Sequence, residues 1–327
     1  MTPRIAVTAG DPRGIGSEII LKALADPRVG GRSDLVIVGP SGLSIEVDED
    51  VGEWNASGNV QLAGRLSGKA IERSVALAMN GEVQGIVTAP IDKAALLAGG
   101  YDFAGHTEML AELTGSRVAM MLASVRGSSP ENSNPLRVVL ATTHLPLRAV
   151  VASVDEDVIV RVAETTRAGL REWFGIAEPR IALCALNPHA GDGGRFGSED
   201  QEILAPAARK ARIAGPFPAD TVFVRAMRGE FDAVIAPYHD VGMTAIKVAS
   251  FGSAVNVTLG LPFPRTSPDH GTALDIAGRG IADPSSFIEA LLLCRRIAAL
   301  APSRDGRPSS EGRPPADRSS SPPSISR

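Results

Sequence analysis

Residues 237–280 read PYHDVGMTAIKVASFGSAVNVTLGLPFPRTSPDHGTALDIAGRG, and the rest of the chain is organised around this stretch. Apolar strand patterns, FDAVIAP just before it and AVNVTLG within it, stop repeatedly at Gly, Pro, His or Asp. Rigid strands that end in this way carry polar side chains to a site at the strand ends. The stretch contains two of the five histidines together with three further polar residues: His239, His270, Lys247, Asn256 and Arg265. Other parts of the chain are expected to supply their partners.

The bulk composition indicates a globular protein that binds neither nucleic acid nor a membrane. The 327 residues are 44% hydrophobic and 21% charged, with a formal net charge of −4 and no long block of one sign. Cys184 and Cys294 lie inside apolar runs, which indicates buried free thiols in a reducing compartment. The chain shows no secretory signal pattern and no window of about 18 apolar residues, so a cytoplasmic location is predicted.

Short apolar strand patterns alternate with amphipathic helical patterns along most of the chain. This alternation favours an α/β fold with largely parallel strands, arranged as two lobes or one large unit. Residues 41–67 give only a poor signal. The predicted strands include 4–9, 35–38 and 85–90, and the predicted helices include 17–26, 70–79 and 155–174.

The loop GDPRGIG follows the first predicted strand. Its glycines, at positions 10, 14 and 16, do not fit the G-x-G-x-x-G spacing, so an ordinary Rossmann domain is not favoured. Free backbone N–H groups at the start of the next helix favour an anion or another closely approaching ligand. A tight turn that needs glycine for a positive φ is the alternative.

The histidines share one kind of position, because all five lie in loops bounded by glycine or proline. His144, His189 and His239 each follow an apolar strand, so they should lie along one edge of a parallel sheet. Three neutral imidazoles suit a divalent ion such as zinc, but no local motif such as H-E-x-x-H is present. The residues alone therefore leave metal-binding and structural roles open. Asp240 is expected either to orient the imidazole of His239 or to cap a turn.

Two further groups of polar residues are candidates for binding an anion or a substrate. Lys247 and Arg265, near Asn256, can hold a phosphate or a carboxylate, although charges at strand ends can also simply be exposed. In GHTE, His106 and Thr107 precede a helical pattern. Thr107 is predicted to cap this helix, and helix-start chemistry alone would also explain the motif.

Together these residues resemble the PdxA family, the 4-hydroxythreonine-4-phosphate dehydrogenases of vitamin B6 biosynthesis. The resemblance covers residues 5 to about 293. The last motif is also similar to the loop HGSAPDIAGKGIANP of isopropylmalate and isocitrate dehydrogenases, which binds the adenosine part of the dinucleotide. The matching motifs, in the family's order, are GDPRGIG, TAPIDKAAL, GHTE, TTHLPL, NPHAGDGG, YHDVG, VNVTLGLPFPRTS and DHGTALDIAGRGIADP.

The resemblance implies an isocitrate/isopropylmalate dehydrogenase-like α/β fold, with two α/β lobes and a cleft between them. Residues 1–127 and 258–300 would form the first lobe. Residues 128–257 would form the second lobe, with the metal-binding histidines and the dimer interface. The polar segment 126–135 suits either a crossover between the lobes or an exposed hairpin loop. Residues 301–327 are predicted to be a disordered tail, because their composition cannot offset the entropy of ordering them.

The family's functional residues carry over to this chain by motif. The resemblance implies a homodimer with a shared site, a divalent metal (Zn, Mg, Co or Mn), and NAD or NADP. The general base stays open between a metal-bound hydroxide, Lys247 and a neighbouring Asp such as Asp240. The implied metal ligands are His144, His189 and His239; the implied substrate contacts are His106, Thr107, Lys247, Asn256 and Arg265; the implied cofactor contacts are His270, Gly271, Thr272, Ala273 and Asp275.

The expected reaction is metal- and NAD-dependent oxidation of 4-hydroxy-L-threonine 4-phosphate to the 3-keto acid, which loses carbon dioxide to give 3-amino-2-oxopropyl phosphate. One alternative is oxidation of D-erythronate or D-threonate 4-phosphate in sugar-acid catabolism. A more distant alternative is a non-redox metal-dependent enzyme or a phosphometabolite-binding protein. The chain departs from the usual family pattern at Arg13, Ser17 and Val241, and Arg13 and Val241 bear on the choice of substrate.

Overall fold

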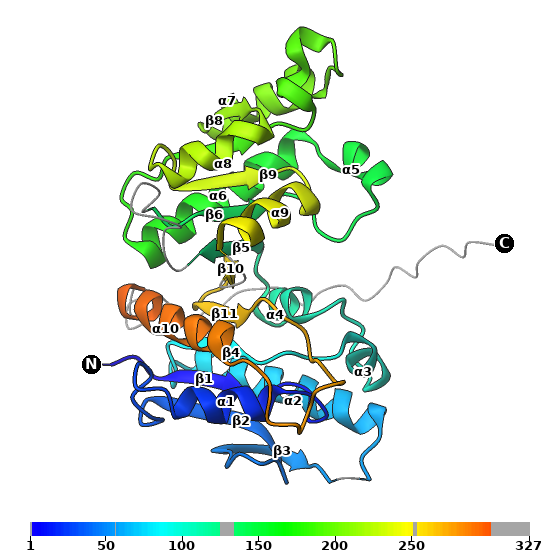
Figure 1. Cartoon of the computed structure of the whole chain (residues 1–327), viewed down its shortest axis with the longest axis vertical. Helices are drawn as coiled ribbons and strands as arrows, with labels where there is room; N and C mark the ends of the chain where they lie inside the picture. The colour runs from blue at the N-terminus through cyan, green and yellow to red at the C-terminus, as the bar shows by residue number, and fades with distance from the viewer. Residues whose placement is uncertain (1, 56, 125–133, 251–253, 302–327) are drawn as a thin grey trace, which may run out of the picture.

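The computed structural model describes residues 2–55, 57–124, 134–250 and 254–301. Within these residues, eleven strands form one sheet in the order β3-β2-β1-β4-β11-β10-β5-β6-β9-β7-β8, which runs through the length of the molecule (Figure 1). The strands are β1 Ile5–Thr8, β2 Leu35–Ser41, β3 Glu49–Glu53, β4 Gly85–Thr88, β5 Ala119–Ser124, β6 Arg137–Leu140, β7 Ile181–Cys184, β8 Ala214–Phe217, β9 Ala233–Ala236, β10 Ala254–Leu259 and β11 Arg265–Pro268.

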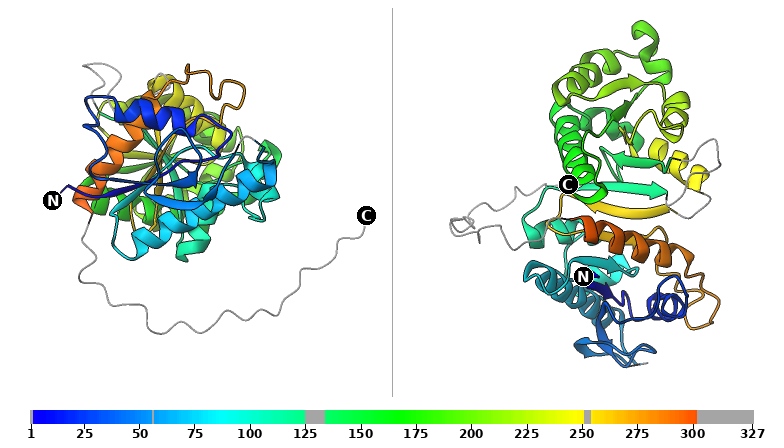
Figure 2. Two further views of the ribbon diagram at one scale, coloured as in Figure 1. Left: turned by 90° about the horizontal axis from the view of Figure 1, so that it is seen from below. Right: turned by 90° about the vertical axis from the view of Figure 1, so that its left-hand side faces the viewer.

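The helices cover both faces of this sheet. On one face α10 packs against β4, β10 and β11 and also contacts α6, so it joins the two halves of the molecule (Figures 1 and 2). The helices are α1 Gly16–Leu24, α2 Val60–Met79, α3 Lys93–Ala98, α4 His106–Thr114, α5 Leu147–Ser153, α6 Glu156–Phe174, α7 Ala205–Ala211, α8 Ala219–Met227, α9 His239–Ser250 and α10 Ser285–Leu300. None of these helices is long and apolar enough to cross a membrane.

The sheet consists of two parallel blocks joined by antiparallel strands. Strands β3, β2, β1, β4 and β11 are parallel neighbours, and so are β6, β9, β7 and β8. Between the blocks, β10 is antiparallel to β11 and to β5, and β5 is antiparallel to β6. The two blocks therefore run in opposite directions, while the sheet stays continuous between them. The prediction of largely parallel strands is confirmed, and the antiparallel centre is an addition to it.

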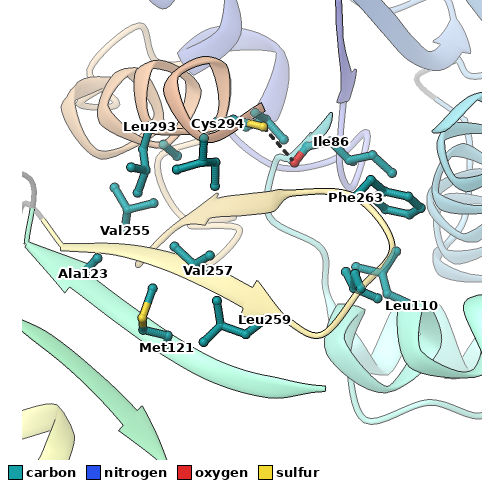
Figure 3. Packing of buried hydrophobic residues seen from close by; sticks show 14 of the residues in the cluster. Ile86, Leu110, Met121, Ala123, Val255, Val257, Leu259, Phe263, Leu293 and Cys294 are labelled. Carbon is teal, nitrogen blue, oxygen red and sulfur yellow. Dashed lines mark hydrogen bonds between the residues drawn. The ribbon is translucent and has the colours of Figure 1, made fainter. Parts of the chain in front are cut away.

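The alternation of side chains on β10 decides which groups are buried and which face the opposite side of the sheet. Val255 and Val257 pack beneath α10, beside Leu293 (Figure 3). Each aliphatic side chain buried in this way contributes about 1.5–3 kcal/mol. Because side chains alternate along a strand, Asn256 points to the other face. That face of β10 and β5 is where the candidate site lies.

Helix α9 packs unusually closely on the second parallel block. A Cβ atom on Gly242 would lie 2.7 Å from Leu140 and 2.9 Å from Val138, both on β6. Glycine is therefore needed at this position for the close approach of helix and strand, although it lowers helix propensity. The approach fixes where α9 presents its polar face.

The sequence-based element predictions hold for the strong apolar patterns and differ from the structure mainly between residues 41 and 79. The strands expected at 4–9, 35–38 and 85–90 are β1, β2 and β4. The helix expected at 155–174 is α6, and Asp155 caps it by accepting a hydrogen bond from Val158 N at 2.7 Å. Helix α2 begins at Val60 rather than Ala70, and β3 lies in the region of poor signal.

The predicted division into lobes stays a prediction. The proposed boundary between residues 127 and 128 lies outside the described residues, and so does the expected disordered tail beyond Ala301. The boundary between 257 and 258 falls within β10, which pairs with strands of both halves.

Candidate active site

A cavity of about 460 Å³ lies over the open face of β5 and β10. It is bordered by the ends of β4 and β11 on one side and by the loop after β6 and the start of α9 on the other. The polar residues that line it are Thr88, Lys93, His106, Thr107, Glu108, His144, His239, Lys247, Asn256, Arg265, Ser267, Asp269 and His270. Most of the predicted substrate and metal residues therefore meet in one place.

Arg265 is a buried cation at the base of this cavity. Its side chain is 2% exposed, and its guanidinium donates hydrogen bonds to the hydroxyls of Thr258, at 3.0 Å, and Thr88. Among the described residues no carboxylate lies within ion-pair distance of it. Burial lowers the pKa of Arg265 to about 10, so the group stays charged at neutral pH. A buried charge without an ion partner favours binding of an anion.

Within the described part of the chain, four buried polar atoms on cavity-lining residues from different elements have no hydrogen-bond partner. Buried polar atoms are nearly always hydrogen-bonded, so such a group indicates a place for a polar ligand. The atoms are His106 Nε2, Asn256 Oδ1, Arg265 Nε and His270 Nε2.

His106 is the first residue of α4. Burial, Arg265 and Lys93 hold its pKa well below the usual value, so the imidazole is neutral and can both donate and accept a hydrogen bond. The prediction that Thr107 caps this helix is wrong: the cap position is Gly105, which offers no side-chain hydrogen bond, and Thr107 lies inside the first turn. Thr107 instead lines the cavity.

One face of α9 delivers three side chains to the cavity. His239, Met243 and Lys247 are four residues apart, which places them on the same side of the helix. Lys247 Nζ lies 3.3 Å from Asp269 Oδ2. Burial raises the pKa of Asp269 although Lys247 opposes this shift. The Lys247–Asp269 pair is therefore a candidate for moving a proton within the site.

His144 and His239 come together at the other end of the cavity. Their ring centroids are 5.5 Å apart. Burial, followed by Lys93 and His239, lowers the pKa of His144, so its neutral form, the form that binds metals, is favoured. His239 Nδ1 lies 2.7 Å from Asp240 Oδ1, and this contact fixes the orientation of the ring. Asp240 itself is 87% exposed and does not line the cavity.

His189 lies away from these two histidines. Its strand β7 is a parallel neighbour of β9, and β9 of β6, so the predicted alignment of the three strand ends is confirmed. However, His189 is exposed, has a φ of 54° and begins a run of six consecutive residues with positive φ. It does not line the cavity, and no group of three His, Cys, Asp or Glu residues in the described parts of the chain is arranged to hold a metal ion. One chain therefore brings two of the three predicted ligands together.

The predicted cofactor residues lie on a loop at the rim of the cavity. His270 and Gly271 line it, whereas Thr272, Ala273 and Asp275 lie further out. The carbonyl of Thr272 accepts a hydrogen bond from Ile15 N at 3.1 Å, which joins the loop to the GDPRGIG turn.

Arg13, the departure from the family pattern in the GDPRGIG turn, is held by two carboxylates. Its guanidinium forms ion pairs with Asp11 at 2.7 Å and Asp92 at 2.8 Å, so it links the turn after β1 to the start of α3. The side chain is therefore occupied within the protein and does not line the cavity.

Four residues that were not predicted as site residues also line the cavity: Lys93, Glu108, Ser267 and Asp269. Lys93 stands in the motif TAPIDKAAL, and Asp269 directly precedes His270, so the motifs around them were the available signal.

Comparison with known proteins gives a consistent result. The family model described as "Pyridoxal phosphate biosynthetic protein PdxA" matches residues 37–294. A 4-hydroxythreonine-4-phosphate dehydrogenase from Xanthomonas axonopodis pv. citri is 40% identical, covering 91% of this chain and 99% of that protein. One from Desulforapulum autotrophicum is 43% identical, covering 91% and 95%.

Solved structures agree with this result. The crystal structure of 4-hydroxythreonine-4-phosphate dehydrogenase from Klebsiella pneumoniae is 36% identical and superposes with a TM-score of 0.79, covering 91% of this chain and 98% of that one. A terephthalate 1,2-cis-dihydrodiol dehydrogenase from Burkholderia xenovorans is 27% identical, with a TM-score of 0.61 and coverage of 90% and 98%. The predicted α/β dehydrogenase fold class is confirmed.

Proposed function

Since the chain belongs to the PdxA family of pyridoxal phosphate biosynthetic proteins, we propose that it oxidises 4-hydroxy-L-threonine 4-phosphate with a nicotinamide cofactor and a divalent metal. The 3-hydroxyl becomes a ketone, and the resulting β-keto acid loses carbon dioxide to give 3-amino-2-oxopropyl phosphate. The observation that carries this proposal is the buried Arg265, which has no carboxylate partner among the described residues. It faces a cavity in which four lining residues carry unpaired buried polar atoms.

The base of the cavity binds and orients the substrate. Arg265 holds an anionic group of the substrate, and the amide of Asn256 and the neutral imidazole of His106 complete its hydrogen bonds. Thr107 and Lys247 contact the same molecule from the rim. Fixing the substrate at several points presents its hydroxyl to the histidine end of the cavity.

The residues at the histidine end suit a divalent metal in their chemistry. His144 is kept neutral, and Asp240 orients His239 so that its Nε2 is free to act as a ligand. A divalent ion bound there supplies the positive charge that lowers the pKa of the reacting hydroxyl, and the nicotinamide supplies the hydride acceptor. The protein's own part in proton removal is assigned to Lys247 and Asp269, while Asp240 acts on the orientation of His239.

The third metal ligand in this proposal comes from a second copy of the chain. Exposed apolar side chains lie on α5, which follows His144, since Leu147 is 69% and Val151 46% exposed. Phe196, whose ring contacts His189, is 44% exposed. Such groups are typical of a surface that packs against another protein. A homodimer that places His189 of one copy beside His144 and His239 of the other would complete the set.

The cofactor is assigned to the loop that carries His270, Gly271, Thr272, Ala273 and Asp275. Asp275 is exposed, and a carboxylate there would accept a hydrogen bond from a ribose 2′-hydroxyl but repel a 2′-phosphate. The proposal therefore favours NAD over NADP. A cytoplasmic location remains part of the proposal.

An assay with three substrates tests this function. Purified protein, a divalent metal and NAD are incubated with 4-hydroxythreonine 4-phosphate, 4-phosphoerythronate and threonate 4-phosphate, and NADH is followed by its absorbance. The first substrate is expected to have the highest kcat/KM. A higher value for a sugar-acid phosphate would change the assigned substrate, and no NADH from any of the three would contradict the dehydrogenase assignment.

A further inference from the structure

Two charged side chains of α1 hold the far end of the loop that carries the proposed cofactor residues. The carboxylate of Glu18 accepts hydrogen bonds from Gly280 N at 3.2 Å and Ala282 N at 2.8 Å. The ammonium of Lys22 donates to Gly280 O at 2.9 Å and Ala282 O at 2.6 Å, and it also lies 2.9 Å from Glu18. All the backbone polar groups of these two loop residues are thus bound by one ion pair.

The side chains of Glu18 and Lys22 make the hydrogen bonds that a neighbouring strand would make to Gly280 and Ala282. In a sheet, alternate residues of an edge exchange both N–H and C=O hydrogen bonds with the neighbouring strand. Here Glu18 supplies the acceptors and Lys22 the donor. The two side chains are 15% and 34% exposed, so the contact is partly protected from water.

The same helix region also holds the beginning of this loop. Ile15 N donates to Thr272 O at 3.1 Å, and a Cβ on Gly14 would lie only 2.9 Å from that oxygen, so the turn before α1 fits closely against the loop. The loop runs beside α1 (Figure 1) and lies at the outer edge of the molecule in both views of Figure 2. Between its two anchors Leu274 is 44% exposed, whereas Ala273, Ile276 and Ala277 are half-buried and pack against the core. The anchors on α1 therefore fix the two ends of the loop, and its apolar side chains hold the middle.

We propose that Glu18 and Lys22 are positioning residues that hold residues 270–282 in the shape that receives the adenosine half of the dinucleotide. This inference rests on the proposed function, because it takes the loop as the cofactor site. Neither side chain lines the cavity, so neither touches the hydroxy acid. Loss of the ion pair should weaken cofactor binding and leave the chemical step unchanged.

The first experiment compares steady-state kinetics of Glu18→Gln, Lys22→Met and Lys22→Arg with the wild type. The first two variants are expected to raise KM for NAD about tenfold, with kcat and KM for the hydroxy acid within about twofold, since uniform binding is lost. Lys22→Arg keeps the donors and should recover most of the affinity. The matched control is Glu156→Gln, which removes the exposed pair with Lys210 in the other half of the molecule and should change none of these values.

The second experiment measures hydrogen exchange of the amides of Gly280 and Ala282. In Glu18→Gln they should exchange at least about tenfold faster, while amides of β10 keep their wild-type rates. If these amides exchange at the wild-type rate in Glu18→Gln, the inference is overturned. It is also overturned if they exchange faster but the Kd of the variant for NAD, measured by calorimetry, is unchanged.

The calorimetric titration also separates this inference from the proposed function. If the wild type reduces no NAD with any of the three acids, the function fails. A raised Kd for NAD in both Glu18→Gln and Lys22→Met would still support the positioning role, whereas an equal Kd, or no binding to the wild type, would overturn it.

Discussion

At one end of the cavity, Arg265 and Asn256 stand on neighbouring strands in the middle of the sheet, and two threonine hydroxyls fix the guanidinium. At the other end, His144 and His239 stand on a loop and on the first turn of a helix, while His189 lies apart on an exposed loop. The residues of the proposed anion site meet within one chain, whereas the histidine end brings together two of the three proposed metal ligands. In our proposal, substrate binding therefore depends on residues of the monomer, whereas the metal centre depends on assembly.

Backbone conformation shows the same contrast. His144 and His189 both have positive φ, at 49° and 54°, in a region that is uncommon for residues other than glycine. Arg265 and Asn256 lie in regular strands. Unusual backbone conformations persist where the surrounding structure or a ligand compensates for them, so the histidine end is expected to gain order on assembly and metal binding.

The strongest test of this contrast mixes two inactive variants. His189→Ala and His239→Ala should each lose activity by at least about a thousandfold, because each removes a proposed metal ligand. Unfolding and refolding them together should restore about a quarter of wild-type activity, since half of the dimers are mixed and each mixed dimer has one intact site. The measurement is NADH formation before and after mixing. No recovery would place all three histidines of a site in one chain.

The anion end is tested by Arg265→Met. We expect kcat/KM to fall about a thousandfold, which corresponds to about 4 kcal/mol of lost transition-state binding. The free energy of unfolding should change little, because a buried charge without an ion partner contributes little to stability. Steady-state kinetics and denaturant unfolding give the two values.

The matched control for this variant is Arg137→Met. Arg137 is also largely buried, donates to Asp232 O at 3.0 Å and stacks on Phe174, but it does not line the cavity. The Arg137→Met variant should have a lower free energy of unfolding than the wild type and an unchanged kcat/KM. If the two variants show the same pattern, Arg265 has only a structural role.

A smaller effect is expected from Asp240→Asn. The change weakens the contact that orients His239, and loss of such a partner typically lowers metal affinity by about 10–100-fold. Activity should return at saturating metal, and metal titration of the apo protein measures the shift. Asp157→Asn, an exposed carboxylate on α6, serves as the control. A lowered kcat that excess metal does not restore would instead give Asp240 a direct part in the chemistry.

The smallest effect is a change in the pH dependence of stability from His106. Burial, Arg265 and Lys93 depress the pKa of His106 in the folded protein. The stabilisation that depends on its neutral imidazole is therefore fully present above the unfolded pKa of about 6.5, and it is lost as the pH falls towards the folded pKa. Below pH 6.5 the wild type should lose about 1.4 kcal/mol per pH unit more than His106→Asn. Urea unfolding between pH 7 and pH 5 measures the slopes, and equal slopes would contradict a buried neutral imidazole.

The sequence predicted the parts of the fold that depend on strong local patterns. The apolar strands that end at His144, His189 and His239 are parallel neighbours, as expected. Helix α9 was not predicted, because its first residues, HDVG, resemble a turn and its cavity-facing side carries Lys247. β3 was missed because an edge strand with the sequence EDVGE has no apolar run.

For the site, the motifs identified most of the residues but not their arrangement. Arg265, Asn256 and His106 meet in one cavity as expected. His189 lies apart from His144 and His239, because the loop after β7 has a left-handed backbone that carries it away from the cavity. Asp269 was passed over in favour of Asp240, because only the structure shows which carboxylate faces the cavity. Tertiary placement of this kind is not encoded in local spacing.

The pairing of β4 with β11 also has a consequence for how the chain folds during synthesis. Thr88 and Arg265, which are hydrogen-bonded in the finished protein, are 177 positions apart. At roughly 5–20 residues per second, the ribosome needs on the order of 10–35 seconds to make the intervening chain. Throughout this time β4 is an open sheet edge, which is a site where chains can pair wrongly. The nascent protein therefore has a defined period in which a chaperone that covers β4 would raise the yield of correctly folded chains.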